Sequence, residues 1–242
     1  MNYDRYLKQI ILPEIGKSGQ SKFSSSKVIV VGAGGLGSVV LYYLASAGIG
    51  HIKIIDSDKV DITNLNRQFI YNDADVGRVK SLTTMEKIQN FNHEISITSS
   101  NIYINAENIE DHISSCDMVI ACVDNKKTRH ILNSHCINKN IPLIDGGING
   151  FEGYVFTILP DLTPCFNCLF PEKKEISEPI GVIGAAVGVI GSMMALQSIK
   201  VLLKIKIDCF LHYVDLMSFR VLPISAEKKP GCPICGYKTY KT

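Results

Sequence analysis

Short runs of β-branched residues alternate along the chain with longer segments whose apolar residues recur at helical spacing. The run at 27–31 ends at glycines, and the apolar positions that follow predict a helix over 36–47. A second apolar run at 51–55 completes a strand–helix–strand unit. Such a unit predicts two parallel strands joined by a right-handed crossover, because connections of the other hand are rare.

This alternation continues to about residue 146 and then changes. Further helices are expected at 80–90, 106–114 and 126–140, and further strands at 95–102, 117–123 and from 142 onward. Residues 152–159 alternate as in an antiparallel strand, and 210–215 with 219–224 predict a hairpin. We therefore predict an α/β fold with a Rossmann-like sheet, whose parallel N-terminal part is continued by antiparallel strands.

The chain of 242 residues is expected to form one domain, since domains commonly contain roughly 100–200 residues. Its expected parts are a helical arm over 1–26, a Rossmann-like part over 27–150, and antiparallel strands, a long helix and a cysteine-bearing tail over 151–242. Charged residues make up 20% of the chain and hydrophobic residues 46%, which argues against long disordered segments.

Charge and hydropathy narrow the classes of partner. A net charge of +2 is too small for a nucleic-acid-binding coat, so no nucleic-acid partner is expected. The N-terminus lacks a basic-then-apolar signal pattern, which favours the cytoplasm. The apolar run at 180–203 reaches membrane-spanning length, but it stands alone and carries Ser192, Gln197 and Lys200. We expect a buried helix rather than a membrane span, with glycines that let another backbone approach closely.

The first candidate for chemistry is the glycine-rich turn at 32–37, which contains Gly32, Gly34, Gly35 and Gly37. Between a strand and a helix, such a turn lets phosphate approach the backbone and the positive end of the helix dipole. Asp56 lies about 20 residues further on, where an acid commonly accepts ribose hydroxyls. On this evidence a nicotinamide or flavin enzyme is as consistent as an ATP-binding one.

Polar residues further along the chain favour a triphosphate. Arg67 follows in a polar stretch for which a dinucleotide enzyme has no need, Lys80 lies near the start of a predicted helix, and Asp124 follows a predicted strand. Taken singly, Arg67 and Lys80 could be solvated surface charges and Asp124 an N-terminal helix cap. Their combination at ligand-facing positions favours a site for ATP.

At this point the sequence resembles the MoeB/ThiF/HesA family, bacterial relatives of the ubiquitin-activating enzymes, over nearly the whole chain. The motifs that carry the resemblance are 5–9 (RYLKQ), 32–37 (GAGGLG), 56–58 (DSD), 64–68 (NLNRQ), 76–80 (VGRVK), 123–125 (VDN) and two cysteine pairs. The resemblance implies a nucleotide site that comprises Gly32, Gly34, Gly35, Gly37, Asp56, Asp58, Thr63, Asn64, Arg67, Lys80, Asp124 and Asn125. By the same resemblance, Asp124 coordinates magnesium.

The resemblance also implies the activity. A member of this family uses ATP to adenylate the C-terminal glycine carboxylate of a small ubiquitin-like carrier protein ending in Gly-Gly, which then accepts sulfur, in some cases from a persulfide donor. Arg67 and Lys80 would neutralise the phosphates as the carboxylate attacks, and no protein nucleophile is needed. A cytoplasmic homodimer without membrane or nucleic-acid partners is expected.

Two cysteine pairs with two-residue spacing, Cys165 with Cys168 and Cys232 with Cys235, predict a second site. Four thiolates fill a closed tetrahedral zinc site, which is structural because no coordination position stays open. A redox pair or a disulfide is the alternative, and a reducing cytosol disfavours the disulfide. The remaining cysteines, at 116, 122, 136 and 209, are expected in the core, and His130 and His135 on a helix surface.

The chain departs from the family pattern at two places. The N-terminal motif of the family has a second arginine that reaches the partner's triphosphate, whereas this chain has Lys8, which keeps the charge but loses the bidentate fork. Several relatives carry a reactive cysteine before the long helix, whereas residues 176–179 contain Ser177 and no cysteine. We therefore expect no covalent thioester or acyl disulfide there.

Three other functions are weighed against the leading one. A peptide of a natural-product pathway could replace the carrier protein as the acceptor without a change of chemistry. A non-catalytic partner subunit would explain Lys8 and Ser177, but it would not need Arg67, Lys80 and Asp124. An oxidoreductase would need an acid–base pair beside a hydride acceptor, and the segments after Asp124 offer no clear pair.

Overall fold

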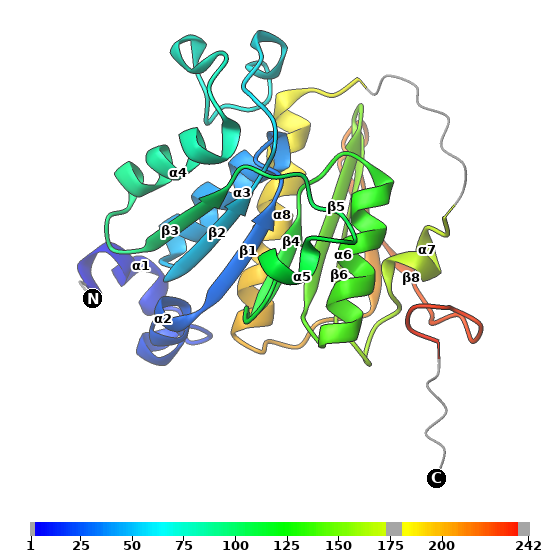
Figure 1. The fold of residues 1–242 in the computed structure, drawn as a ribbon. Coiled ribbons are helices and arrows are strands. Elements are labelled where there is room, and N and C mark those ends of the chain that lie inside the picture. The colour runs from blue at the N-terminus through cyan, green and yellow to red at the C-terminus, as the bar shows by residue number, and fades with distance from the viewer. Residues whose placement is uncertain (1–2, 173–180, 237–242) are drawn as a thin grey trace.

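The β-branched run that ends at the glycine turn lies inside a continuous sheet in the computed structural model of the protein, which describes residues 3–172 and 181–236. Within these residues the strands are β1 Lys27–Val31, β2 His51–Ile55, β3 Ser96–Ser100, β4 Met118–Ala121, β5 Leu143–Asn149, β6 Glu152–Ile158, β7 Phe210–Asp215 and β8 Arg220–Ser225. Their order across the sheet is β3-β2-β1-β4-β5-β6-β7-β8 (Figure 1).

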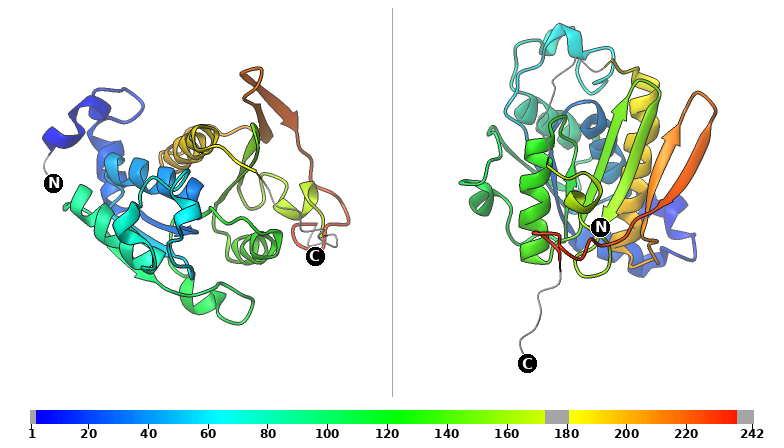
Figure 2. Two further views of the ribbon diagram at one scale, coloured as in Figure 1. Left: turned by 90° about the horizontal axis from the view of Figure 1, so that it is seen from above. Right: turned by 90° about the vertical axis from the view of Figure 1, so that its right-hand side faces the viewer.

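The first five strands run parallel and the last three antiparallel, as the sequence predicts. β1 pairs in parallel with both β2 and β4, and β5 turns directly into β6 through an antiparallel pairing that joins Leu143 to Ile158. The β7–β8 hairpin extends the sheet to its far edge, where it stands apart from the helices (Figure 2). The mixed α/β fold class is therefore confirmed.

Helices cover both faces of the sheet. They are η1 Tyr3–Tyr6, α1 Leu7–Ile10, α2 Gly16–Ser25, α3 Gly35–Ala47, η2 Ile62–Asn64, η3 Asp73–Asp75, α4 Lys80–Phe91, α5 Ile109–His112, α6 Lys126–Lys139, α7 Phe166–Leu169 and α8 Gly184–Leu202. Alternate strand residues form two cores: α3, α4 and α8 pack on one face, and α5, α6 and α7 on the other. The central parallel strands β1 and β4 are thus buried on both sides, as their apolar runs require, whereas the edge strand β3 is largely exposed.

The long apolar helix α8 packs with one face against α3 and the sheet, through buried residues that include Val187, Ile190 and Met194. It is the one helix among the described residues that passes a length and composition test for a membrane span, and core helices pass the same test. Two of its three glycines lie at close contacts, since a Cβ on Gly191 would lie 2.6 Å from Val39 Cβ of α3, and one on Gly184 would lie 2.6 Å from Asn66 O, whereas one on Gly188 would meet nothing within 4 Å. Close backbone approach is therefore found at two glycines, but the helix is buried along one face only, with 44% of its 18-residue window inside the domain.

Several local predictions need correction. The helix expected over 106–114 is reduced to the four-residue α5, because the side chains of Asn105 and Asn108 accept hydrogen bonds from nearby backbone N–H groups and compete with helix formation. His135 is buried and bonds Ile113 O at 2.8 Å, whereas Cys209 is exposed rather than in the core. His130 is half-buried, with its ring 5.0 Å from that of Phe166.

Candidate active site

The glycine turn lies where the chain order of the sheet reverses. From β1 the chain crosses to β2 on one side and later returns to β4 on the other, so the turn sits between the carboxyl ends of both neighbours. Gly32 N donates to Ile55 O at 2.8 Å, and Gly32 has a φ of +98°. A Cβ there would lie 2.5 Å from Cys122 O, so only glycine fits. Ligands of open α/β sheets bind at this switch point.

The other glycines of the turn are required for different reasons. A Cβ on Gly37 would lie 2.1 Å from Gly32 O, so the first turn of α3 packs directly on the backbone of the glycine turn. A Cβ on Gly34 would meet only the end of the Gln68 side chain, at 3.6 Å, which leaves open space beside the start of α3. The first amides of α3 have no partner within the helix and face an anion-binding position.

Arg67 lies beside the turn. A Cβ on Gly35 would lie 3.7 Å from Arg67 Cγ and 2.9 Å from Val187 Cγ1 of α8, so Gly35 makes room for both side chains. The exposed guanidinium donates from Nη1 to Thr63 O at 2.9 Å and to Asn66 Oδ1 at 3.0 Å. Its other nitrogens leave donors available for an anion beside the start of α3.

Asp56 is tied to the glycine turn at the carboxyl end of β2. Its Oδ2 accepts a hydrogen bond from Ala33 N at 2.7 Å, and its Oδ1 accepts one from Asp58 N at 2.8 Å. Burial raises the pKa of Asp56, and the two backbone donors and Lys80 oppose that rise. Each oxygen keeps a free lone pair, so the carboxylate can still accept a ribose hydroxyl.

Lys80 is a buried cation at the start of α4. Its side chain is 7% exposed, and Nζ lies 3.2 Å from Asp58 Oδ2. The backbone supports this pair, since Lys80 N also donates to Asp58 O at 2.9 Å. An ammonium group has three donors, and Asp58 occupies one of them. The pair therefore holds a cation in place at the edge of the sheet where Asp56 and the glycine turn lie.

Three other predicted nucleotide contacts bond locally. Thr63 Oγ1 donates to Asp61 Oδ1 at 2.6 Å, and Asn64 Oδ1 accepts from Asp61 N at 3.2 Å, which closes the short helix η2. Asn125 Oδ1 caps α6 by accepting from Thr128 N at 2.8 Å. These side chains shape the loops beside the site, and any contact with a nucleotide would use their remaining donors or lone pairs.

Asp124 is exposed and follows β4 at the same edge of the sheet. Because Asn125 caps α6, the alternative interpretation of Asp124 as the cap of that helix does not hold.

Lys8 lies far from this edge of the sheet. Gln9 Nε2 donates to Ala47 O at 2.8 Å, which places α1 at the far end of the 13-residue helix α3 (Figure 1). That end is about 20 Å from the glycine turn. The structure therefore does not bring Lys8 to the turn of its own chain.

Tyr71 connects the parts of the site, and sequence reasoning missed it. Its buried hydroxyl donates to Ala33 O of the glycine turn at 2.8 Å and lies 2.8 Å from Thr84 Oγ1 and 3.5 Å from Lys80 O. Burial raises the pKa of Tyr71 far above its ordinary value, so the hydroxyl stays protonated. The residue holds the turn against the first turns of α4. In the sequence, Tyr71 is one more aromatic residue in a polar loop.

The four cysteines form one cluster on the face of the sheet that α5, α6 and α7 cover. Their Sγ atoms all lie within 4.8 Å of one another, including Cys165 to Cys232 at 3.6 Å and Cys168 to Cys235 at 3.4 Å. Thiolates around a tetrahedral zinc ion lie about 3.8 Å apart, so the donor set and spacing fit zinc. Asn167 Nδ2 and Lys229 N each lie 3.5 Å from a cluster sulfur, as outer donors of such sites do.

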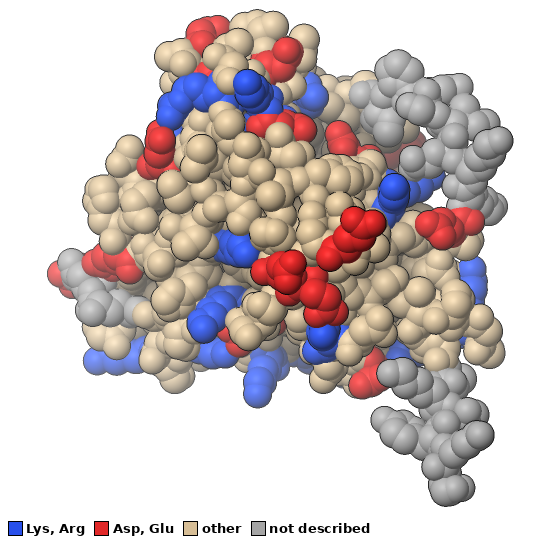
Figure 3. Space-filling view, viewed as in Figure 1, with Lys and Arg blue, Asp and Glu red and all other residues tan. Residues whose placement is uncertain are grey.

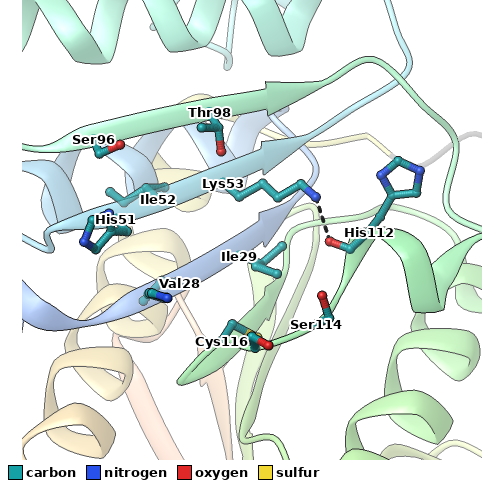
Figure 4. Close-up of a pocket in the computed structure, with 12 residues that line it drawn as sticks. Val28, Ile29, His51, Ile52, Lys53, Ser96, Thr98, His112, Ser114 and Cys116 are labelled. Carbon is teal, nitrogen blue, oxygen red and sulfur yellow. Dashed lines mark hydrogen bonds between the residues drawn. The ribbon is translucent and has the colours of Figure 1, made fainter.

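A separate pocket of about 220 Å³ lies at the amino ends of β1, β2 and β3 (Figure 4). Lys53 spans it and donates from Nζ to His112 O at 2.8 Å. None of the predicted nucleotide-binding residues lines this pocket, which lies at the opposite end of the sheet from the switch point.

On the face shown in Figure 3, basic and acidic side chains are interspersed, which agrees with the small net charge.

Comparisons with known proteins show the family of the chain. The model of the ThiF family matches residues 6–234. The chain is 36% identical over 240 residues to the SAMP-activating enzyme E1 of Haloferax volcanii, covering 96% of this chain and 88% of the relative. It is 34% identical over 240 residues to the sulfur carrier protein ThiS adenylyltransferase of Escherichia coli K12, covering 97% and 96%.

Solved structures share the fold. A crystal structure of E. coli MccB with MccA-N7isoASN superposes with a TM-score of 0.87 at 22% identity, covering 98% of this chain and 75% of that one. A crystal structure of E. coli MccB with ATP gives a TM-score of 0.81, also at 22% identity, covering 98% and 80%. At this level of identity the likeness concerns the fold.

Proposed function

The chain belongs to the ThiF family, and on that premise we propose that it is an ATP-dependent adenylyltransferase. Its acceptor would be the C-terminal glycine carboxylate of a ubiquitin-like sulfur carrier protein ending in Gly-Gly, in a pathway of the thiamine thiazole or molybdopterin type. The observation that carries the proposal is the meeting of Asp56, Arg67, Lys80 and the open side of Gly34 at one edge of the sheet.

The reaction needs cations more than it needs a nucleophile. A carboxylate oxygen of the carrier attacks the α-phosphorus of ATP and forms an acyl–phosphate bond, while the bond to the β-phosphate oxygen breaks and pyrophosphate departs. Both partners are anions, so Arg67 and Lys80 stabilise the transition state by neutralising charge as it shifts toward the leaving group. The acyl-adenylate would then be consumed by a sulfur nucleophile, such as a persulfide donor.

Two metals belong to the proposal. Asp124 would hold magnesium, which would supply positive charge for the departing pyrophosphate. Zinc, held by Cys165, Cys168, Cys232 and Cys235, would be structural and would join the C-terminal segment to the loop that follows β6. A closed set of four thiolates leaves no open coordination position for catalysis.

Exposed apolar surface supports a protein acceptor and a second copy of the chain. Every residue of β8 is exposed, including Leu222 and Ile224, which suits a protein partner better than a small molecule. On α8, which packs against α3, Leu196 is 58% exposed, and Tyr43 of α3 is 51% exposed. We infer a homodimer that covers this face. If Lys8 contributes to binding the phosphates, it would have to be the Lys8 of the partner subunit.

Residues 176–179, where no covalent adduct is expected, lie outside the described residues.

ATP–pyrophosphate exchange tests the proposal. The purified protein is assayed with magnesium and ATP, with and without carriers ending in Gly-Gly, and the assay is repeated for Arg67→Ala and Asp124→Ala. Carrier-dependent exchange in the wild type, with loss in both variants, is the expected result. Exchange with a natural-product peptide alone would move the acceptor to the alternative class. The absence of exchange with every acceptor, from protein that still binds ATP, would overturn the activity itself.

A further inference from the structure

A buried arginine ties together three strands next to the nucleotide edge. Arg129 on α6 has a side chain that is 9% exposed. Its Nη1 donates to Asp145 Oδ1, to Gly146 O at 2.8 Å and to the Tyr154 hydroxyl at 3.2 Å, while Nη2 donates to Val123 O. The contacts therefore reach β5, β6 and the residue two positions beyond the end of β4.

This arrangement keeps the guanidinium charged and fixed. Burial alone would lower the pKa of Arg129, but the Asp145 carboxylate beside it raises the pKa above its ordinary value. Asp145 is itself held from the other side, since the Tyr154 hydroxyl donates to Asp145 Oδ2 at 2.7 Å. A planar fork of donors can bind a carboxylate and two carbonyls at once, which the single ammonium of lysine cannot do in the same geometry.

The contact with Val123 O is the one that bears on the active site. Val123 directly precedes Asp124, and Asn125 on the other side is fixed by its cap to Thr128 N at 2.8 Å. Arg129 N also lies 3.4 Å from Asn125 O, so the same residue closes the first turn of α6. The backbone on both sides of Asp124 is thus anchored, while Asp124 itself is exposed.

We propose that Arg129 is a positioning residue that sets the location of Asp124 for binding magnesium·ATP. The inference rests on the proposed function, in which Asp124 holds the metal. Groups that orient a metal ligand commonly change metal affinity about 10–100-fold when they are lost, although they touch neither metal nor substrate. Catalytic constellations also need ligands to be held within about 0.5 Å.

Three variants separate positioning from folding. Arg129→Lys keeps the buried charge but loses the planar set of guanidinium donors. The double variant Arg129→Met, Asp145→Leu removes both buried charges, a replacement that proteins often tolerate without loss of stability. Tyr154→Phe is the matched control, because it removes two hydrogen bonds from the same network, to Arg129 and to Asp145, and leaves the Arg129 bond to Val123 O in place.

The readout is the ratio of the Kd for ATP without magnesium to the Kd with magnesium, measured by calorimetry without a chelator, so that the cysteine site keeps its metal, on protein whose folding is checked by circular dichroism. We expect Asp124→Asn to abolish most of this ratio, both Arg129 variants to reduce it about tenfold or more, and Tyr154→Phe to change it less than about twofold. A wild-type ratio in the folded Arg129 variants, with Asp124→Asn impaired, overturns this inference alone. A ratio near one in the wild type overturns it together with the magnesium role of Asp124.

Discussion

Gly34 and Gly37 lie three residues apart in the same turn, yet alanine should affect them in opposite ways. A Cβ on Gly37 would lie 2.1 Å from Gly32 O and 3.0 Å from Gly32 C, both backbone atoms that no side-chain rotation can move. Overpacking of a core costs typically about 1–3 kcal/mol, and a backbone clash lies at or above the upper end of that range. For a domain of this size, about 3 kcal/mol lowers Tm by about 6–12 °C.

Gly34→Ala should leave the fold nearly intact and impair ATP binding. Gly34 has a φ of −82° and a ψ of −148°, which lies beyond the usual β region of alanine, and the new methyl would meet only the end of the Gln68 side chain, with Nε2 at 3.6 Å. We expect a loss of stability of about 1 kcal/mol, which comes from adjustment of the backbone and is smaller than the loss in Gly37→Ala. The methyl occupies the open side of the turn, where a phosphate oxygen would accept a backbone N–H. Loss of one such charge-assisted bond costs about 1.5–3 kcal/mol, which is about a 10–100-fold increase in Kd.

Thermal melts and calorimetric titration with magnesium·ATP measure both quantities for each variant. Gly188→Ala is the control, because a Cβ there meets nothing within 4 Å in the interior of α8. It should bind ATP as the wild type does and melt at the same or a slightly higher temperature, since alanine favours a helix over glycine by about 0.5–1 kcal/mol. Wild-type ATP affinity in Gly34→Ala, or equal loss of stability in Gly34→Ala and Gly37→Ala, would refute the assignment of the turn as a phosphate cradle.

Three further predictions concern stability. Tyr71→Phe should lower the free energy of unfolding by about 1–3 kcal/mol in urea denaturation, because Ala33 O loses its buried donor; an unchanged midpoint would contradict this. Burial alone would raise the pKa of Asp75, but the hydrogen bond from Lys87 and the other donors lower this pKa below its ordinary value. The Asp75 carboxylate therefore stabilises the fold fully above its unfolded pKa of about 3.9, and this stabilisation is lost as the pH falls through the lower pKa of the folded state. The stability deficit of Asp75→Asn should therefore shrink between pH 5 and pH 3, and a deficit independent of pH would count against the ion pair. Removal of zinc with a chelator, or Cys235→Ser, should lower Tm, with recovery on adding zinc only in the wild type; a Tm indifferent to chelation would exclude a structural metal.

The sequence predicted the sheet well because its signals are local. Apolar runs of five residues, a glycine turn and an acid after the next strand each depend on neighbours in the chain, and β1, β2 and the switch point follow from them. The failed helix at 106–114 shows the limit of periodicity. Two asparagine side chains there outcompete the helical hydrogen bonds, and spacing of apolar residues does not register that competition.

The parts of the site that the sequence missed depend on contacts between distant segments. Tyr71 meets Ala33 across 38 positions, and Arg129 meets Tyr154 across 25. Nothing in the spacing of a tyrosine in a polar loop or an arginine on a helix indicates such a partner. Likewise, the sequence could suggest a role for Lys8 but not that α1 packs at the opposite end of α3 from the turn.

Mass spectrometry of the acceptor tests the central claim most directly. A purified carrier ending in Gly-Gly is incubated with the protein, ATP and magnesium, and its intact mass is recorded with and without hydroxylamine. The account predicts a carrier that gains one adenylyl group at its C-terminus, with release of pyrophosphate, and that hydroxylamine converts to the C-terminal hydroxamate with release of AMP. Cleavage of ATP to ADP and phosphate, with every carrier and peptide left unmodified, would contradict it.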